Sequence, residues 1–171
     1  MPVSREGKEA GFLMAVLRGR FLVATVSAAC VDLAVKSAVI TAVATGARHE
    51  VLPFVDIVRH TNAGIAFGLF QELGDFPRLF LHVSALVLAG VFAVLFLRRG
   101  ANALAVGLVT GGAIGNSVER LVFGGVTDFV SVHWFGSESL RWPAFNMADV
   151  FITVGAAALV VDLLTARCSR G

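Results

Sequence analysis

The chain has 171 residues, of which 57% are hydrophobic and only 15% are charged, whereas soluble domains average roughly 45–50% and about 25%. With a mean hydropathy of +0.82, these values exclude a disordered chain, a collagen and a disulfide scaffold, and they indicate an integral membrane protein. The net charge of +2, with dispersed basic residues, gives no reason to expect nucleic-acid binding.

Four stretches are long and apolar enough, or nearly so, to cross a bilayer core about 30 Å thick as helices. They are residues 21–44, 79–97, 101–121 and 147–166. We therefore predict an all-α polytopic membrane protein with four transmembrane helices in one domain, residues 1–171. Residues 21–30 resemble the core of a signal sequence, but apolar sequence continues past Asp32 without a cleavage context, so we expect a retained first helix.

The basic residues that flank these spans predict the orientation of the chain. One side would carry eight Lys or Arg, at positions 5, 8, 18, 20, 98, 99, 167 and 170; the other would carry five, at positions 48, 59, 78, 120 and 141, over longer loops. We therefore expect both termini in the cytoplasm and the loops 45–78 and 122–146 outside.

The first outer loop, residues 45–78, has a pattern of its own. Residues 51–61 are rich in Val, Ile and Phe, and turn-forming Asn62-Ala63-Gly64 follows. This pattern favours a small β element on the membrane surface. A surface amphipathic segment is an equally supported alternative.

The first predicted span carries two charges, Asp32 and Lys36, one helical turn apart. At that spacing they share a helix face and can pair. Ionisable residues inside a span are functional candidates because their insertion is costly. A neutralised structural pair explains the same spacing, so both interpretations stay open.

The third predicted span carries glycines at every fourth position, namely Gly107, Gly111 and Gly115. Small residues at this spacing let another helix approach closely. On a neighbouring face Gly112, Asn116 and Glu119 or Arg120 follow at helical spacing. A polar row beside a glycine seam favours an inward-facing stripe, although helix packing with an interfacial Arg120 is the alternative.

Two carboxylates are predicted to meet at the outer mouth of the bundle. Asp128 comes just after the third span, and Asp149 opens the fourth. Asn146 with Asp149 three residues later is typical of a helix N-cap, which needs no catalysis. Two carboxylates held close together in a low dielectric share a proton, and such a pair can activate water against an amide.

Other hydrolytic sites fit the sequence less well. No His-Glu-x-x-His motif occurs, and the four histidines are scattered, which argues against a zinc protease. No Gly-x-Ser-x-Gly is present. A Ser–Lys dyad using Lys36 has the weakness that Asp32 is the better-placed partner. Cys30 and Cys168 show no metal-ligand spacing.

Five motifs in order on these spans resemble those of the bacterial lipoprotein signal peptidases, the signal peptidase II family. They are Asp32-x-x-x-Lys36, Asn62-Ala63-Gly64-Ile65-Ala66-Phe67, Gly111-Gly112-Ala113-Ile114-Gly115-Asn116-Ser117-Val118-Glu119-Arg120, Val126-Thr127-Asp128-Phe129 and Phe145-Asn146-Met147-Ala148-Asp149. The resemblance covers about residues 20 to 165.

The resemblance implies an aspartic endopeptidase of the bacterial inner membrane, without metal or cofactor. Its substrates would be prolipoproteins that carry diacylglycerol on the lipobox cysteine, cut just before that cysteine. It also implies a small β-cradle and a surface helix between the first two spans, on the periplasmic side. Membrane lipids would surround the enzyme, which we expect to be a monomer.

Carried over residue by residue, the resemblance makes Asp128 and Asp149 the catalytic pair. It implies that eight further residues bind substrate or shape the site, namely Asp32, Lys36, Asn62, Gly112, Asn116, Arg120, Asn146 and Ala148. One residue departs from the family pattern, since Glu119 stands where an Asp is usual. The charge is kept on a longer side chain.

Two other classes of function compete with the peptidase. A small transporter could use Asp32, Lys36 and Asp149 as a proton or ion relay, although the hydrophobic pattern shows no clear duplicated half. A purely structural membrane protein would explain the glycine seam but not the clustered acids.

Overall fold

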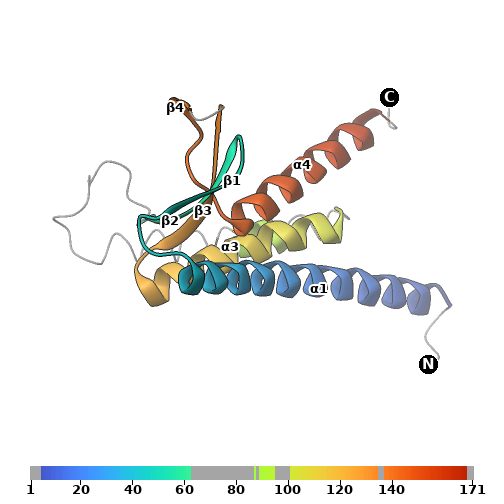
Figure 1. Ribbon diagram of the computed structural model, residues 1–171. Helices are drawn as coiled ribbons and strands as arrows, with labels where there is room; N and C mark the ends of the chain where they lie inside the picture. The colour runs from blue at the N-terminus through green and yellow to red at the C-terminus, as the bar shows by residue number, and fades with distance from the viewer. Residues whose placement is uncertain (1–4, 63–86, 88, 95–100, 135–136, 169–171) are drawn as a thin grey trace.

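The computed structural model describes residues 5–62, 87, 89–94, 101–134 and 137–168, which form helices and an antiparallel sheet (Figure 1). In chain order the elements are α1 (Arg5–Ala42), β1 (Arg48–Leu52), β2 (Val55–Asn62), α3 (Ala103–Phe123), β3 (Val126–Trp134), β4 (Ser137–Arg141) and α4 (Met147–Cys168). Residues 87 and 89–94 are also helical and belong to the predicted second span, whose other residues lie outside the described part of the chain.

Two helical segments are long and apolar enough to cross a membrane, Gly11–Ala42 in α1 and Met147–Ala166 in α4. α3 does not meet that criterion, because its glycines and the polar residues of its second half lower its hydropathy. α3 lies between α1 and α4 and packs against both, as Figure 1 shows. The count of four spans therefore stays a prediction.

The first helix is longer than predicted, since it begins at Arg5 rather than Phe21 and ends at Ala42. No proline interrupts this segment, and arginine is a good helix former. Arg18 and Arg20 therefore oppose burial in a bilayer without breaking the helical backbone. The chain leaves the helix through a turn in which Gly46 has a φ of 78°, a conformation that favours glycine.

The predicted glycine seam is confirmed and faces α1. A Cβ atom at Gly107 would lie 2.6 Å from Cβ of Ala24, and one at Gly115 would lie 2.5 Å from Oδ2 of Asp32. A Cβ at Gly111 would collide with the backbone oxygen of Thr25. The two helices thus touch almost backbone to backbone, which brings the polar residues of α3 against those of α1.

The sheet has the order β1-β2-β3-β4, with all neighbours antiparallel. Its first two strands, which span residues 48–62, confirm the β interpretation of residues 51–61. The predicted surface helix falls outside the described residues. Its other two strands come from the loop 122–146, where we predicted none. The all-α description is therefore correct for the bundle and too narrow for the outer loops, because residues 126–132 pair with β2 in an antiparallel register.

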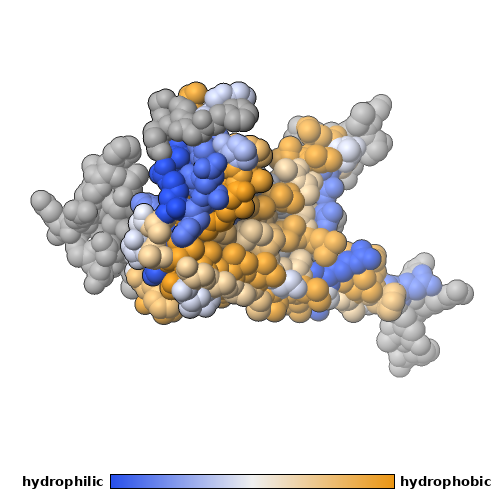
Figure 2. All heavy atoms as spheres, viewed as in Figure 1, coloured by the Kyte–Doolittle hydropathy of each residue, from blue (hydrophilic) through white to orange (hydrophobic). Residues whose placement is uncertain are grey.

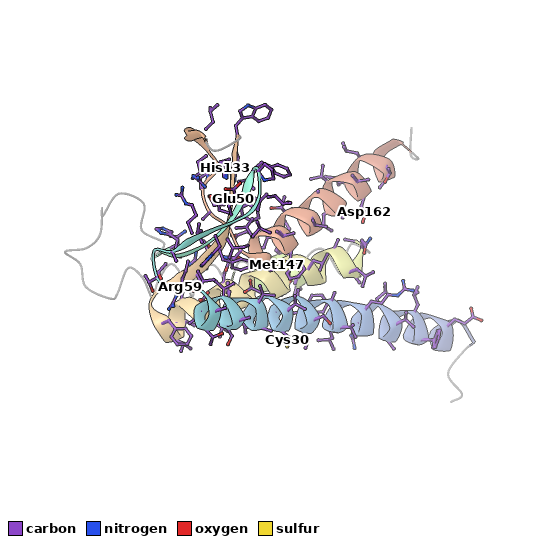
Figure 3. All side chains as sticks on the ribbon, viewed as in Figure 1. Cys30, Glu50, Arg59, His133, Met147 and Asp162 are labelled. Carbon is purple, nitrogen blue, oxygen red and sulfur yellow. The ribbon has the colours of Figure 1, made fainter. Side chains whose placement is uncertain are left out.

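One arginine ties the sheet to the end of the first helix. Arg59 of β2 donates from Nη1 to the backbone oxygens of Ile40 at 2.9 Å and Val43 at 3.2 Å. Those carbonyls have no partner within the helix, and a cation is favoured at a helix C-terminus. In Figure 3 Arg59 lies where β2 meets α1, and Met147 lies where α4 leaves the sheet.

A single added methyl group should test the seam. Alanine normally favours a helix over glycine by about 1 kcal/mol. Gly111→Ala should nevertheless lower the melting temperature of the purified protein, because its Cβ would push α1 and α3 apart, at a cost of about 1–3 kcal/mol. Gly19→Ala is the matched control, since a Cβ there meets nothing within 4 Å and should leave stability unchanged or higher. Equal melting temperatures for the two variants would contradict the close approach of α1 and α3 at Gly111.

Candidate active site

Asp128 lies near the start of β3, and both oxygens of its carboxylate are hydrogen bonded. Asn62 donates from Nδ2 to Oδ2 at 3.1 Å, and Asn146 donates from Nδ2 to Oδ1 at 2.7 Å. The side chain is almost fully buried, with 4% of its residue surface exposed. Asn62 itself is exposed at the end of β2. The sheet therefore carries this carboxylate to the mouth of the bundle.

Asp149 lies in the first turn of α4 and is less buried than Asp128. Its Oδ1 accepts a hydrogen bond from Nδ2 of Asn116 at 3.0 Å, and its Oδ2 accepts the backbone N–H of Asn146 at 3.1 Å. The Asp149 N–H in turn donates to Oδ1 of Asn146 at 3.1 Å. These reciprocal bonds confirm the N-cap that the Asn146–Asp149 spacing predicted.

Asn146 is the residue that brings the two aspartates together. Its Oδ1 and its backbone N–H hold Asp149, and its Nδ2 holds Asp128. Only 1% of the residue is exposed, and both polar atoms of its side chain are hydrogen bonded. Asp128 and Asp149 thus share one side-chain amide as a common partner.

The environment of Asp128 favours its protonated form. Burial is the main cause that raises the pKa of Asp128 above its ordinary value, and the nearby charge of Asp149 raises it further. The hydrogen bonds from Asn62 and Asn146 oppose this effect but do not cancel it. A carboxyl group with a raised pKa can act as an acid near neutral pH.

Lys36 lies behind the two aspartates and contacts three oxygen acceptors. Its Nζ is 2.8 Å from Oδ2 of Asp32, 3.1 Å from Oε2 of Glu119 and 2.7 Å from Oδ1 of Asn116. The predicted Asp32–Lys36 pair is confirmed, and only 1% of Lys36 is exposed. Since Asn116 also donates to Asp149, the ammonium group orients that amide toward the catalytic candidate.

Asp32 connects the first helix to the start of the last one. Its Oδ1 accepts the backbone N–H of Ala148 at 2.8 Å, one of the unpaired donors at the N-terminus of α4. Ala148 is fully buried, and a Cβ at Gly112 would lie 2.6 Å from its carbonyl oxygen. Gly112 and Ala148 are therefore small because two backbones meet there, beside Asp149.

Glu119 makes a contact that the sequence did not predict. Its Oε2 accepts the backbone N–H of Thr127 at 3.0 Å, and the same oxygen faces Lys36. Thr127 directly precedes Asp128, so the end of α3 holds the strand residue beside the catalytic candidate. The longer side chain of Glu in place of the usual Asp is compatible with this reach.

Arg120 is the one predicted site residue that the described contacts do not link to the others. Its Nε is buried without a hydrogen-bond partner among the described residues.

Asp162, the other acid of the fourth predicted span, lies far along α4 from the sheet in Figure 3. Within the described ranges no group of three His, Cys, Asp or Glu side chains is placed to hold a metal ion.

A second polar cluster lies on the sheet and was not predicted. Asp56 is 2.9 Å from Nη1 of Arg141, 3.3 Å from Nε2 of His133 and 3.6 Å from Nε of Arg48. Burial alone would raise the pKa of Asp56, but Arg141 and His133 hold it below its ordinary value. Its members come from four strands, so no local spacing in the sequence reveals it.

A family model described as "Signal peptidase (SPase) II" matches residues 24–165. The lipoprotein signal peptidase of Rhodopseudomonas palustris is 40% identical over 119 residues, covering 67% of this chain and 72% of that protein. The lipoprotein signal peptidase of Burkholderia thailandensis is 37% identical over 136 residues, covering 78% and 80%.

Solved structures support the same relationship. A bacterial membrane enzyme determined by the in meso method at 2.3 Å resolution matches with a TM-score of 0.72 and 26% sequence identity, over 90% of this chain and 92% of that one. A second such structure, at 1.9 Å, matches with a TM-score of 0.71 and 28% identity, over 85% and 93%.

Loss of the Lys36 charge alone should lower stability more than loss of all three charges of Asp32, Lys36 and Glu119. Lys36→Met leaves Asp32 and Glu119 without their cation in the bundle, which typically costs about 3–5 kcal/mol. A triple variant, Asp32→Asn, Lys36→Met and Glu119→Gln, leaves no charge in this cluster and should melt at a higher temperature than Lys36→Met alone. Additive effects of the three substitutions on the melting temperature would contradict the pairing.

The raised pKa of Asp128 predicts how stability depends on pH. The folded state favours protonated Asp128, so this contribution to stability is fully present below the ordinary aspartate pKa of about 4 and is lost as pH rises through the raised value. Asp128→Asn, which has no charge to bury, should lose less stability across that range. Thermal melts over pH compare the two proteins, with Asp162→Asn as a control away from the sheet. Parallel curves for wild type and Asp128→Asn would disprove the effect.

Proposed function

The chain belongs to the signal peptidase II family, and from this premise we propose how its own residues perform the reaction. As a member it is an aspartic peptidase of a bacterial membrane that cleaves the signal peptides of prolipoproteins. We propose that Asp128 and Asp149 are its catalytic pair. The observation that carries this assignment is that one residue, Asn146, bonds both carboxylates, Asp149 through its backbone N–H and Asp128 through its side-chain Nδ2.

In the proposed reaction Asp149 is the base and Asp128 is the acid. Burial favours the proton on Asp128, whereas Asp149 is the less buried of the two and accepts one N–H donor at each carboxylate oxygen. Ionised Asp149 takes a proton from a water molecule as the water oxygen attacks the scissile carbonyl carbon. Protonated Asp128 gives its proton to the carbonyl oxygen, which yields a tetrahedral diol.

Collapse of the diol completes the cycle. The C–N bond breaks, the departing amine nitrogen takes the proton held by Asp149, and Asp128 recovers a proton from the diol hydroxyl. The products are a carboxylic acid and an amine, and both aspartates return to their starting states. Each aspartate changes protonation once in each direction, so the pair is ready for another turnover.

The remaining site residues support this pair in the proposed mechanism. Asn116 and Asn146 orient the two carboxylates, and Lys36 fixes Asn116. Asp32, Gly112 and Ala148 set how closely α4 approaches the other helices. Asn62 is exposed and Arg120 has a buried Nε without a described partner, so these two are the best candidates for contacts with substrate.

The substrate proposal follows from the family and from the apolar surroundings. We propose that substrates carry diacylglycerol on the lipobox cysteine and are cut just before it. The chain would act as a single-domain monomer with four spans in the inner membrane. Both termini would be cytoplasmic and the aspartates would lie at the periplasmic face, as the distribution of basic residues favours.

The alternative of a transporter gains no support from the site. Lys36, which a proton or ion relay would use, already faces three acceptors from the protein itself.

Removal of either catalytic carboxylate should abolish cleavage without unfolding the protein. Asparagine is nearly isosteric with aspartate but is not a base at neutral pH. Asp128→Asn and Asp149→Asn should each lower kcat for a lipidated prolipoprotein by about 10²–10⁴-fold, and the double variant should be little worse, because the two act as a unit. The purified variants are assayed in detergent beside Asp162→Asn, which should keep wild-type turnover. Near-normal turnover by either folded single variant would overturn the two-aspartate mechanism.

A further inference from the structure

β3 carries Asp128 near one end and Trp134 at the other, and the two faces of its sheet differ in chemistry. Alternation along the strands puts Asp56, Ser131, His133 and Arg141 on one face. These residues are linked, since Arg141 donates from Nη1 to Asp56 at 2.9 Å and to Ser131 at 2.7 Å. That face is polar, and Arg141 links its side chains to one another.

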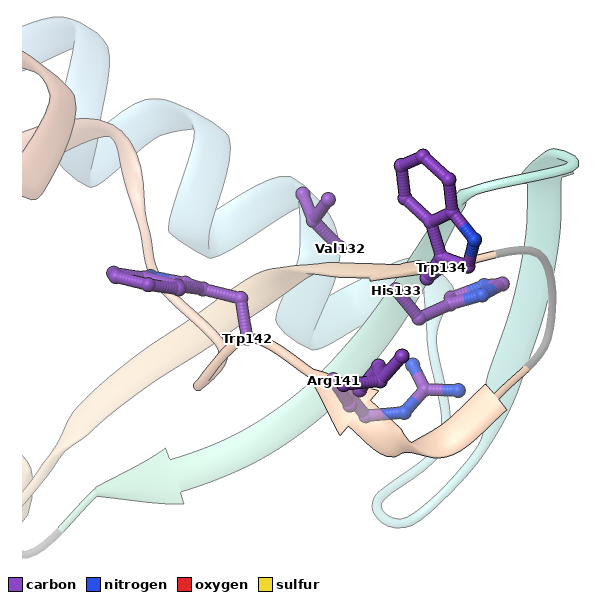
Figure 4. Close-up of a pocket in the computed structure, with 6 residues that line it drawn as sticks. Val132, His133, Trp134, Arg141 and Trp142 are labelled. Atoms are coloured by element: carbon purple, nitrogen blue, oxygen red, sulfur yellow. The ribbon is translucent and has the colours of Figure 1, made fainter.

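The opposite face of the outer hairpin is apolar and exposed. Trp134 is 67% exposed, Leu140 is 63% exposed and Trp142 is 69% exposed. Together with Val132, and with His133 and Arg141 at its polar side, they line a hollow of about 480 Å³ between β3 and β4. In Figure 4 Val132 and Trp134 rise from one side of β3, whereas His133 and Arg141 lie toward the other. Large apolar side chains on one face mark an interaction surface.

The orientation of this face identifies what covers it. Figure 2 shows hydrophilic atoms on the side of the sheet that faces away from the helices and hydrophobic atoms on the side toward α4. That hydrophobic surface continues onto the helices, where Val154, Val160 and Leu164 of α4 are more than half exposed. The outward side of a membrane-spanning helix faces lipid, so the apolar face of the hairpin borders the same bilayer.

We propose that Trp134 and Trp142 anchor the β3–β4 hairpin in the interface between lipid acyl chains and headgroups. Tryptophan is enriched at that level because its ring is apolar and its N–H is polar. The anchor would fix the depth of Asp128, which lies on the same strand as Trp134, about 20 Å away at ~3.3 Å per residue. This consequence for cleavage rests on the proposed function; the anchoring itself does not.

The sequence offers an unusually direct test, because the chain contains only two tryptophans. Intrinsic fluorescence therefore reports on the hairpin alone. Trp134→Phe and Trp142→Phe, each with one tryptophan left, are reconstituted in vesicles that contain phosphatidylcholine brominated near the headgroup or deep in the acyl chain. Iodide added to the water phase is the competing quencher.

Anchoring predicts blue-shifted emission, strong quenching by the shallow bromines, weaker quenching by the deep bromines and weak quenching by iodide. Water-exposed emission with strong iodide quenching would overturn the proposal. Shielding from both iodide and bromolipid would also overturn it, since a protein partner would then cover the face. Stronger quenching by the deep bromines would place the rings in the hydrocarbon core, against an interfacial anchor.

A matched control uses the other face of the same sheet. In a Trp134→Phe, Trp142→Phe background, Glu50→Trp introduces a tryptophan at an exposed position that pairs with Asp56 on the polar face. It should be quenched by iodide and not by bromolipid. Lipid quenching of this probe would show that contact with the bilayer is unspecific, which contradicts the proposal.

The effect on cleavage is measured separately. A double variant, Trp134→Ser and Trp142→Ser, should raise KM for a lipidated prolipoprotein severalfold in vesicles, whereas kcat in detergent should stay near wild type. The double Phe variant should be intermediate. An unchanged KM in vesicles would overturn the role in setting depth. If wild-type protein cleaved no lipidated substrate at all, the proposed function would fail while the fluorescence result still decided the anchor.

Discussion

A single ammonium group inside the bundle holds the polar interior of this protein together. Lys36 faces Asp32, Glu119 and Asn116 at hydrogen-bonding distance, and an isolated charge could not remain there without such partners. Each acceptor continues to another element. Asp32 reaches the N-terminus of α4, Glu119 reaches the start of β3, and Asn116 reaches Asp149. The two aspartates are therefore positioned by one common cation, although neither of them contacts it in the described hydrogen bonds.

The N-cap of α4 has a second role in the candidate active site, because its residues also position the two aspartates. The N-cap of α4 would exist in any well-formed helix of this sequence, because Asn146 and Asp149 have the spacing for it. What makes it a candidate active site is the unused half of the Asn146 amide, whose Nδ2 reaches Asp128. Stability of the helix end and alignment of the carboxylates thus depend on the same side chain.

Features encoded by local spacing could be predicted from the sequence. The Asp32–Lys36 pair, the glycine seam and the Asn146 cap each depend on residues three or four positions apart in a helix, and each is present. The contacts of Glu119 with Thr127 and of Asp56 with Arg141 join elements distant in the chain. The strands β3 and β4 were missed for a related reason, since a strand is stabilised by its partners more than by its own residues.

The arrangement around Lys36 also bears on how the chain enters the membrane during synthesis. Asp32 and Lys36 belong to one helical turn, so their charges neutralise each other as soon as α1 forms, before any later segment has emerged. The cation that neutralises Glu119 is not in the same helix, because Glu119 belongs to α3 and Lys36 to α1. The Glu119 charge is therefore neutralised only where α3 lies against α1, so the buried lysine couples the insertion of these two helices.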